Sequence, residues 1–138
     1  MAGVDAPSLR DIVSKESTPR CFFDRGVALR FADLARGTGF GGRLRELAGR
    51  SVLLATESQL TSALALIELE GVARRIVILP PDADPAHFPA IISIAGIDAA
   101  VTDEGAPMQA AFDGLIRVMC SPAIEPLAGD LPPRIHTD

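Results

Sequence analysis

The sequence predicts an α/β fold: a three-layer sandwich with a mostly parallel sheet, preceded by a short N-terminal helix and a β-hairpin. Two observations favour this class. From residue 50 onward, short continuous apolar runs alternate with segments of helical periodicity, and the connections between them are short. This alternation is typical of βαβ units, whose right-handed crossovers place helices on the faces of the sheet. With 138 residues, 48% of them hydrophobic, the chain is long enough for one domain with an ordinary core.

The N-terminal part of the chain predicts the helix and the hairpin. Residues 7–16 carry apolar side chains at helical spacing, with Ser8 as N-cap and Asp11 as its partner in a capping box, in place of the usual Glu or Gln. Two short β-prone runs follow, and the Asp-Arg-Gly sequence between them is a turn signal because Gly adopts positive φ without strain. The strands of this hairpin are expected at residues 20–23 and 27–31.

Residues 31–49 predict a crossover helix that contains several glycines. Apolar residues recur mostly at three-, four- and six-residue steps, and Gly49 closes the segment as glycines often close helices. Each internal glycine disfavours a helix by up to about 1 kcal/mol relative to Ala. Residues 37–42 hold four glycines and are therefore the expected weak point of this helix.

Beyond this helix, strands and helices alternate regularly. Residues 50–57 and 74–80 are continuous apolar runs that suit strands buried on both faces. Ser58 can cap the helix that follows the first of these strands. In the next helix Pro85 fits the first turn, whereas Pro89 predicts a later start or a bend. Further strands are expected at residues 97–103 and 115–119, and helices at residues 58–71, 82–96 and 106–114.

The C-terminal residues 121–138 contain four prolines and show no hydrophobic period. Such a segment predicts an extended arm or linker and not another helix or a central strand. We therefore expect two parts in the chain. Residues 1–120 form the α/β subdomain, and residues 121–138 form the proline-rich arm or linker.

Composition limits the partners of the protein. The net charge is −5, the Lys and Arg residues are spread singly or in pairs, and Trp and Tyr are absent, so a basic stripe and a set of stacking faces for nucleic acid are both missing. No apolar run has the length of a signal peptide core or a membrane span. We expect a cytoplasmic protein without nucleic-acid or membrane partners.

The cysteines and histidines do not form a recognisable site. Cys21 and Cys120 stand far apart and belong to no C-x-x-C pair, so small buried apolar side chains are expected and not a disulfide, a metal site or a nucleophile. His87 and His136 have no further His, Cys or close carboxylate at ligand spacing. We expect no metal site.

One glycine motif raises the possibility of a dinucleotide site. Gly37, Gly39 and Gly42 have the G-x-G-x-x-G spacing that cradles a pyrophosphate, and Glu57 lies twenty residues beyond the first glycine, where the ribose-binding carboxylate of that motif falls. The motif works only where a strand runs directly into the first glycine and a full crossover helix begins after it.

The surroundings of the motif do not meet these requirements. Residues 31–36 have a helical pattern, and residues 43–48 give only about 10 Å of helix, which is too short to cross a strand of roughly 20 Å. Arg36 and Arg43 can attract phosphate, but isolated arginines on a solvated face are commonplace. We favour the glycine-interrupted helix over the cofactor site. No residue is predicted to be catalytic, cofactor-binding or metal-binding.

Several stretches in a fixed order carry a resemblance to a known family. They are Leu29–Leu34 (LRFADL) at the end of the hairpin, Thr56–Gln59 (TESQ) at a helix start, residues 70–81 from a Glu-Gly helix end to a Pro-Pro turn, and residues 97–103, a strand that closes with Asp. Over residues 8–104 the chain resembles the opening of the adenylate-forming superfamily, the AMP-dependent synthetases and ligases that include the acyl-CoA and aryl-CoA synthetases.

This resemblance implies a function for a larger protein. The family adenylates a carboxylic acid with ATP and Mg²⁺ and then forms a thioester with CoA. Its Ser/Thr/Gly-rich phosphate loop and its C-terminal domain have no counterpart in these 138 residues, so no site residue is carried over. We expect an N-terminal scaffold fragment that is not catalytic alone, binds no cofactor itself and has the remainder of the parent ligase as its partner.

Other interpretations stay open. The chain could be a natural, degenerate stand-alone domain. It could also be a Rossmann-like small-molecule or nucleotide-binding module, with the ligand at the carboxyl ends of the strands near residues 56–58 and 80–82. A third interpretation is a dimerisation domain, because a fragment separated from its parent exposes apolar surface that favours a homo-oligomer.

Overall fold

The computed structural model describes residues 6–14, 21–24, 27–30, 33–34, 36–107, 109–127 and 129–138. Its centre is a sheet of four parallel strands in the order β5-β4-β6-β7. These strands are β4 (Ser51–Ala55), β5 (Arg75–Ile78), β6 (Ala99–Asp103) and β7 (Ile116–Cys120). All four lie within the apolar runs that predict them or overlap these runs, and the expected α/β fold with a parallel sheet is confirmed.

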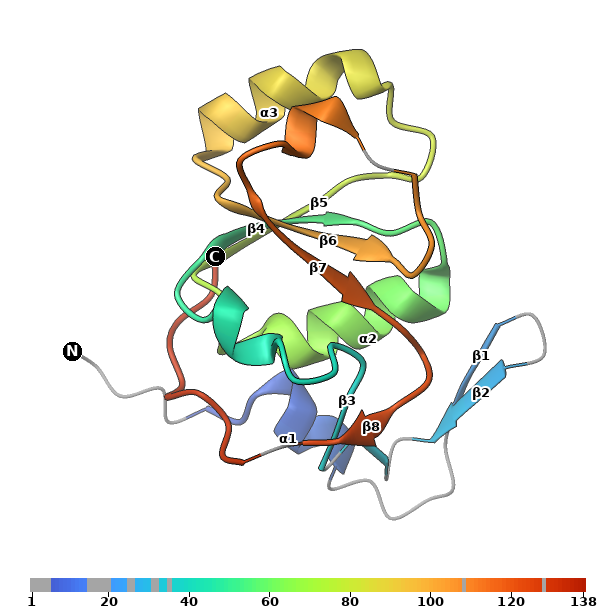
Figure 1. Cartoon of the computed structure of the whole chain (residues 1–138). Helices are drawn as coiled ribbons and strands as arrows, with labels where there is room; N and C mark the ends of the chain where they lie inside the picture. Colours follow the sequence, from blue (N-terminus) through green and yellow to red (C-terminus); the bar gives the residue numbers. More distant parts are fainter. Residues whose placement is uncertain are drawn as a thin grey trace.

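Helices cover both faces of this sheet and complete the three layers (Figure 1). Helix α2 (Gln59–Leu69) lies on one face and α3 (Phe88–Ala95) on the other. A hydrophobic core lies on each side of the sheet, and strand β4 contributes side chains to both. Val52 and Leu54 pack on the α2 side, and Leu53 packs on the α3 side. All three side chains are fully buried, which explains why the strand is continuously apolar from Val52 to Ala55 and does not alternate with polar residues there.

The N-terminal helix forms with the cap that the sequence predicts. Helix α1 spans Leu9–Ser14. The Ser8 N–H donates to Asp11 Oδ2 and the Asp11 N–H donates to Ser8 Oγ, each at 3.1 Å. This reciprocal pair is a capping box, and it satisfies two amides that a helix N-terminus otherwise leaves unpaired.

The predicted hairpin is also present. Strands β1 (Cys21–Asp24) and β2 (Val27–Arg30) pair antiparallel, with Cys21 opposite Arg30. Its turn, residues 25 and 26, lies outside the described residues, as does the side chain of Cys21.

The two longer helices start where their caps and prolines predict. Ser58 Oγ accepts from the Thr61 N–H at 3.3 Å, so Ser58 is the N-cap of α2. A short 3₁₀ turn, η3 (Pro85–His87), precedes α3, and Pro89 stands in the first turn of α3. A proline there disturbs no helical hydrogen bond, because the first amides of a helix have no partner within it.

The prediction of a crossover helix over residues 31–49 is wrong. The described part of this segment forms a two-residue strand, β3 (Gly37–Thr38), and a 3₁₀ helix, η2 (Leu44–Leu47). Strand β3 pairs antiparallel with β8 (Glu125–Pro126) from the C-terminal tail. Four glycines within six residues break the α-helix, although the apolar spacing correctly marks burial. The buried apolar side chains of the segment are Leu34, Phe40, Leu44 and Leu47.

Two smaller expectations also need correction. Strand β5 is not buried on both faces: it is an edge strand, and Ile78 is 53% exposed. The helix expected over residues 106–114 is reduced to a single 3₁₀ turn, η4 (Ala110–Phe112). The backbone is extended at Gln109 before this turn and at Asp113 after it, so the helix continues in neither direction.

The C-terminal tail runs back along the domain as an extended chain. After β8 it passes the end of α2, where the Ile135 N–H donates to Gly71 O at 2.8 Å. At the last residue, the Asp138 N–H donates to Arg74 O at 2.9 Å, and the Ile76 N–H donates to Asp138 O at 2.9 Å. The division of the chain at residue 120 stays a prediction.

In the part of the chain that the structure describes, no helix is long and apolar enough to cross a membrane.

Candidate functional site

A hollow lies where the parallel strands end. After β4 the chain crosses to β5 on one side, and the next strand, β6, lies on the other side of β4. Ligands of open α/β sheets commonly bind outside the carboxyl ends of the strands, at such a change of direction. We therefore describe this edge of the sheet as the candidate site.

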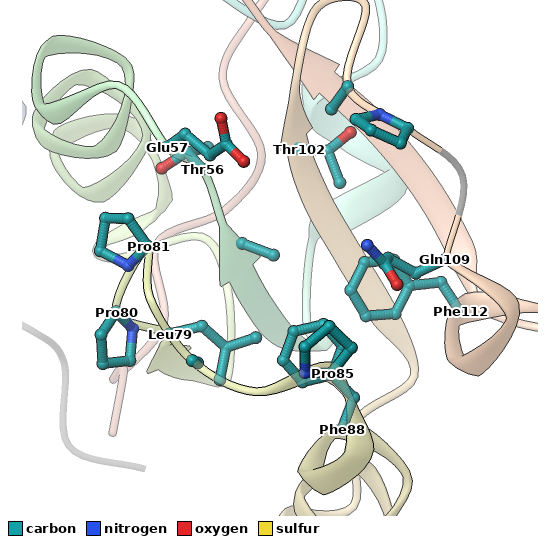
Figure 2. A pocket seen from close by; sticks show the side chains of 14 residues that line it. Thr56, Glu57, Leu79, Pro80, Pro81, Pro85, Phe88, Thr102, Gln109 and Phe112 are labelled. Carbon is teal, nitrogen blue, oxygen red and sulfur yellow. The ribbon is translucent and has the colours of Figure 1, made fainter.

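A cavity of about 140 Å³ opens at this edge. Phe88 and Phe112 form one wall, with ring centroids 5.7 Å apart and planes within 12° of parallel. Pro80 and Pro81 lie on the side opposite Gln109 and Phe112 (Figure 2). The volume is close to that of a cavity that holds one benzene ring, so the site suits a single ring or a short apolar group.

A few polar side chains join this mainly apolar lining: Thr56, Glu57, Thr102 and Gln109. Thr56 is 4% exposed, and its Oγ1 has no hydrogen-bond partner among the described residues. A buried hydroxyl without a partner is unfavourable unless water or a ligand satisfies it. Thr56 is therefore a buried polar side chain of the lining whose hydroxyl is left for a water or a bound group to satisfy.

The loop above the cavity is held by the carboxylate of Asp103, the last residue of β6. Asp103 Oδ2 accepts from the backbone N–H groups of Glu57 and Ser58, which connect β4 to α2. The second oxygen, Oδ1, is buried and has no partner within the described ranges. Asp103 thus positions the loop that carries Thr56 and Glu57.

The electrostatics of the cavity do not suit an anion. Among the described residues that line the cavity, Glu57 is the charged one, and none is a Lys, Arg or His. A phosphate placed here would face a carboxylate without a cation to compensate it. The chemistry of the site favours an uncharged ligand with hydrogen-bond donors.

The structure separates the members of the glycine motif. Each of the three glycines borders a different hollow: Gly37 lies beside the hairpin, Gly39 beside Met119 and Gly42 beside Leu131. Glu57 lines a fourth hollow, the cavity at the strand ends. Their amides therefore do not converge on one ligand, as a dinucleotide fingerprint requires.

The glycines have packing roles instead. A Cβ at Gly39 would lie 2.5 Å from Ser121 O and 2.6 Å from Leu64 Cδ2, and a Cβ at Gly37 would overlap Asp33 O and Ile124. The Gly39 N–H donates to Glu68 Oε2 at 2.7 Å, so it is already used within the protein.

The other residues singled out in the sequence also have structural surroundings. Arg43 forms an exposed bidentate pair with Glu46, at 2.7 and 2.8 Å. Cys120 is 1% exposed, as expected of a small buried residue, and burial raises the pKa of its thiol far above the usual value. Among the residues that the structure describes, no cluster of three or more His, Cys, Asp or Glu could hold a metal ion.

Sequence reasoning identified part of this site and missed the rest. Of the two segments expected to border a ligand, residues 56–58 and 80–82, the structure places residues 56–57 and 80–81 in the lining of one cavity. Sequence reasoning missed Asp103, although an acidic residue that closes a predicted parallel strand is a usable signal. It also missed Phe88 and Phe112, whose stacking depends on η3, α3 and η4 folding against each other.

Comparisons with known proteins give structural matches alone. No family model matches the chain, and no curated protein sequence matches it. Bacillus subtilis O-succinylbenzoate CoA synthetase in complex with AMP matches with a TM-score of 0.63 at 11% identity, over 83% of this chain and 31% of that chain. The Klebsiella oxytoca NpsA N-terminal subdomain in complex with 3-hydroxybenzoyl-AMSN matches with a TM-score of 0.61 at 14% identity, over 90% and 33%.

A third match is a malonyl-CoA ligase in a ternary product complex with methylmalonyl-CoA and AMP, with a TM-score of 0.54 at 23% identity, over 81% of this chain and 23% of that chain. All three are adenylate-forming enzymes. The chain spans about a third or less of the length of these structures. At these identities the likeness establishes the fold, and the fold implied by the sequence resemblance is confirmed.

Proposed function

We propose that this chain is the N-terminal scaffold of an AMP-forming acid:CoA ligase, an enzyme that adenylates a carboxylic acid with ATP and then forms its CoA thioester. The observation that supports the proposal is the shared fold. The matches to O-succinylbenzoate CoA synthetase and malonyl-CoA ligase cover 83% and 81% of this chain. In the parent enzyme the chain forms one wall of a larger domain, and it does not catalyse alone.

The charge of the cavity at the strand ends does not fit the groups that the reaction requires. Adenylation needs cationic groups or a metal ion to compensate the phosphates of ATP. The described residues that line this cavity offer the Glu57 carboxylate and no cationic side chain. The proposal therefore assigns ATP, Mg²⁺ and CoA binding to the remainder of the parent ligase and derives no step of the reaction from this chain.

The test uses the protein encoded by the complete reading frame. It is assayed for carboxylate-dependent exchange of pyrophosphate into ATP with a panel of aliphatic and aromatic acids, and the 138-residue chain serves as the matched control. We expect exchange with at least one acid for the complete protein and none for the control. Exchange by the 138-residue chain alone, or a reading frame that ends at Asp138, would contradict the proposal.

The cavity supports a second candidate function, the binding of a small uncharged ring. The observation that favours it is the buried Thr56 hydroxyl without a partner, beside the stacked rings of Phe88 and Phe112. Aromatic walls with one or two polar groups are typical of small-molecule sites.

Calorimetric titration of the 138-residue chain with adenosine, ATP, NAD and CoA tests this candidate. We expect adenosine to bind more tightly than ATP, because the phosphates of ATP would face Glu57. Gln109→Ala should weaken binding, and Gln59→Ala, a change in the first turn of α2, is the control. Heats of dilution alone for all four compounds would exclude a nucleoside or nucleotide as the ligand of this cavity.

A further inference from the structure

The outer edge of strand β5 is partly paired by the C-terminus of the chain. The Asp138 N–H donates to Arg74 O and the Ile76 N–H donates to Asp138 O, each at 2.9 Å. Asp138 thus bonds to the residue before Arg75 and to the residue after it. This is the hydrogen-bond pattern of two parallel strands. Asp138 therefore lies opposite Arg75 as the first rung of a parallel ladder.

The ladder stops after this rung, although the edge of β5 continues. The Arg75 N–H donates to Arg50 O and the Leu79 N–H to Leu54 O, so alternate residues of β5 turn their backbone groups toward β4. Ile76 and Ile78 turn theirs outward, as the Ile76 bond to Asp138 shows. Within the described residues, no group pairs with the Ile78 N–H, and the Ile78 side chain is 53% exposed.

The composition of β5 is that of an interior strand. After Arg75 it reads Ile-Val-Ile, with apolar side chains toward both faces. Ile76 packs on the α2 side and Val77 on the α3 side of the sheet. Exposed edge strands are usually protected by a charge, a proline or a bulge, because open apolar edges pair with other chains. The stretch from Ile76 to Ile78 has none of these features.

We propose that the polypeptide that follows Asp138 in the parent enzyme continues along Ile76 and Ile78 as a fifth parallel strand of this sheet. The first rung fixes its direction, and three further residues reach the end of β5. The proposal rests on the proposed function, in which a longer chain follows. A strand of this direction ends at the same edge of the sheet as the cavity, and it brings the segment after it to the Pro80 side of that cavity.

A proline at position 78 distinguishes the paired edge from the free one. Ile78→Pro removes an N–H that β4 does not use, and prolines are tolerated on edge strands. In the 138-residue chain, Ile78→Pro should therefore melt at the same temperature as the control Ile78→Val, which keeps the N–H. In the complete protein, Ile78→Pro should melt at a lower temperature than Ile78→Val, because the fifth strand loses a ladder bond.

Hydrogen exchange gives a readout that is independent of activity. In the unmutated complete protein we expect the Ile78 amide to exchange at least about tenfold more slowly than in the 138-residue chain, with protected amides also among the residues after Asp138. Equal exchange of Ile78 in both proteins would overturn the proposal. Protection of Ile78 in a complete protein that lacks pyrophosphate exchange would uphold the fifth strand while the proposed ligase function fails.

Discussion

Arg10 of α1 and Glu68 of α2 form an ion pair at 2.9 Å, with side-chain exposures of 6% and 0%. The guanidinium also donates to Leu34 O at 2.9 Å and to Gly37 O at 2.7 Å, and the carboxylate accepts from the Gly39 N–H at 2.7 Å. This pair therefore connects two helices to the irregular segment that takes the place of the predicted crossover helix.

Arg10→Met should destabilise the protein strongly. The substitution keeps an apolar stem but leaves the Glu68 carboxylate buried without its cation, and loss of one partner of a buried pair typically costs about 3–5 kcal/mol. Urea unfolding at pH 7 measures the change. Arg43→Met is the matched control, because it breaks the exposed pair with Glu46 and should leave the unfolding midpoint almost unchanged. Equal effects of the two substitutions would contradict a structural role for the buried pair.

The stability of the protein should depend on pH through Glu68. Burial raises the pKa of the Glu68 carboxyl above its usual value, and the interactions with Thr38, Gly39 and Arg10 offset part of this rise. A carboxyl with a higher pKa in the folded state binds its proton more tightly when folded. Its contribution to stability is therefore complete below the unfolded pKa, about 4.3, and is lost as the pH rises through the folded pKa.

The control for this pH dependence is Glu68→Gln, whose amide does not titrate. The free energy of unfolding is measured for both proteins from pH 4 to pH 8 by urea titration. We expect the wild-type value, relative to that of Glu68→Gln, to fall as the pH rises and then to level off. A constant difference would show that the pair with Arg10 balances burial, and a difference that rises with pH would show that the pair outweighs burial.

Asp103→Ala should loosen the loop between β4 and α2. Asp103 accepts from the Glu57 and Ser58 amides, and loss of hydrogen bonds to a charged group at this position should cost about 1.5–3 kcal/mol. Asp103→Asn keeps one acceptor and should lie between wild type and the alanine variant. Amide exchange of Glu57 and Ser58 reports the loop directly. Unchanged amide exchange in Asp103→Ala would show that Asp103 does not position the loop between β4 and α2.

The central sheet and its helices follow from local signals in the sequence. Strand β4 is apolar from Val52 to Ala55 because neighbouring residues such as Leu53 and Leu54 face different cores, so a continuous apolar run predicts it correctly. The capping box of Ser8 and Asp11 and the N-cap at Ser58 are bonds between near neighbours. Features of this kind depend on the side chains of one segment, and a single sequence is sufficient to predict them.

The features that were missed depend on contacts between distant segments. Residues 37–38 are a strand because residues 125–126 of the tail pair with them, and no local pattern indicates this partner. The ion pair of Arg10 and Glu68 joins residues 58 positions apart. Burial of β5 depends on its place in the sheet order, which apolarity alone does not determine.

The candidate site was predicted in outline and not in detail. The carboxyl ends of parallel strands meet at one edge, so the segments near Thr56 and Pro80 could be placed together from the order of strands. The position of Asp103 depends on β6 lying next to β4 and not at the edge. The wall formed by Phe88 and Phe112 depends on two irregular 3₁₀ turns, which have weak sequence signals.

Substitutions in the glycine motif separate packing from ligand binding. Gly39→Ala places a Cβ 2.5 Å from Ser121 O and 2.6 Å from Leu64 Cδ2, and the backbone oxygen cannot move aside without shifting its strand end. Overpacking of this kind typically costs about 1–3 kcal/mol. The displaced chain would also weaken the bond from the Gly39 N–H to Glu68. We therefore expect a lower unfolding midpoint in urea for Gly39→Ala.

Gly42→Ala is the matched control from the same motif. No atom lies within 4 Å of the position that its Cβ would take, so the substitution should leave stability unchanged within about 0.5 kcal/mol. In a dinucleotide cradle both glycines would approach a pyrophosphate, and both variants would keep their fold and lose affinity for NAD. Unequal stability of Gly39→Ala and Gly42→Ala, with no change in NAD titration, supports the packing role. Equal stability together with parallel losses of NAD affinity would restore the cofactor interpretation.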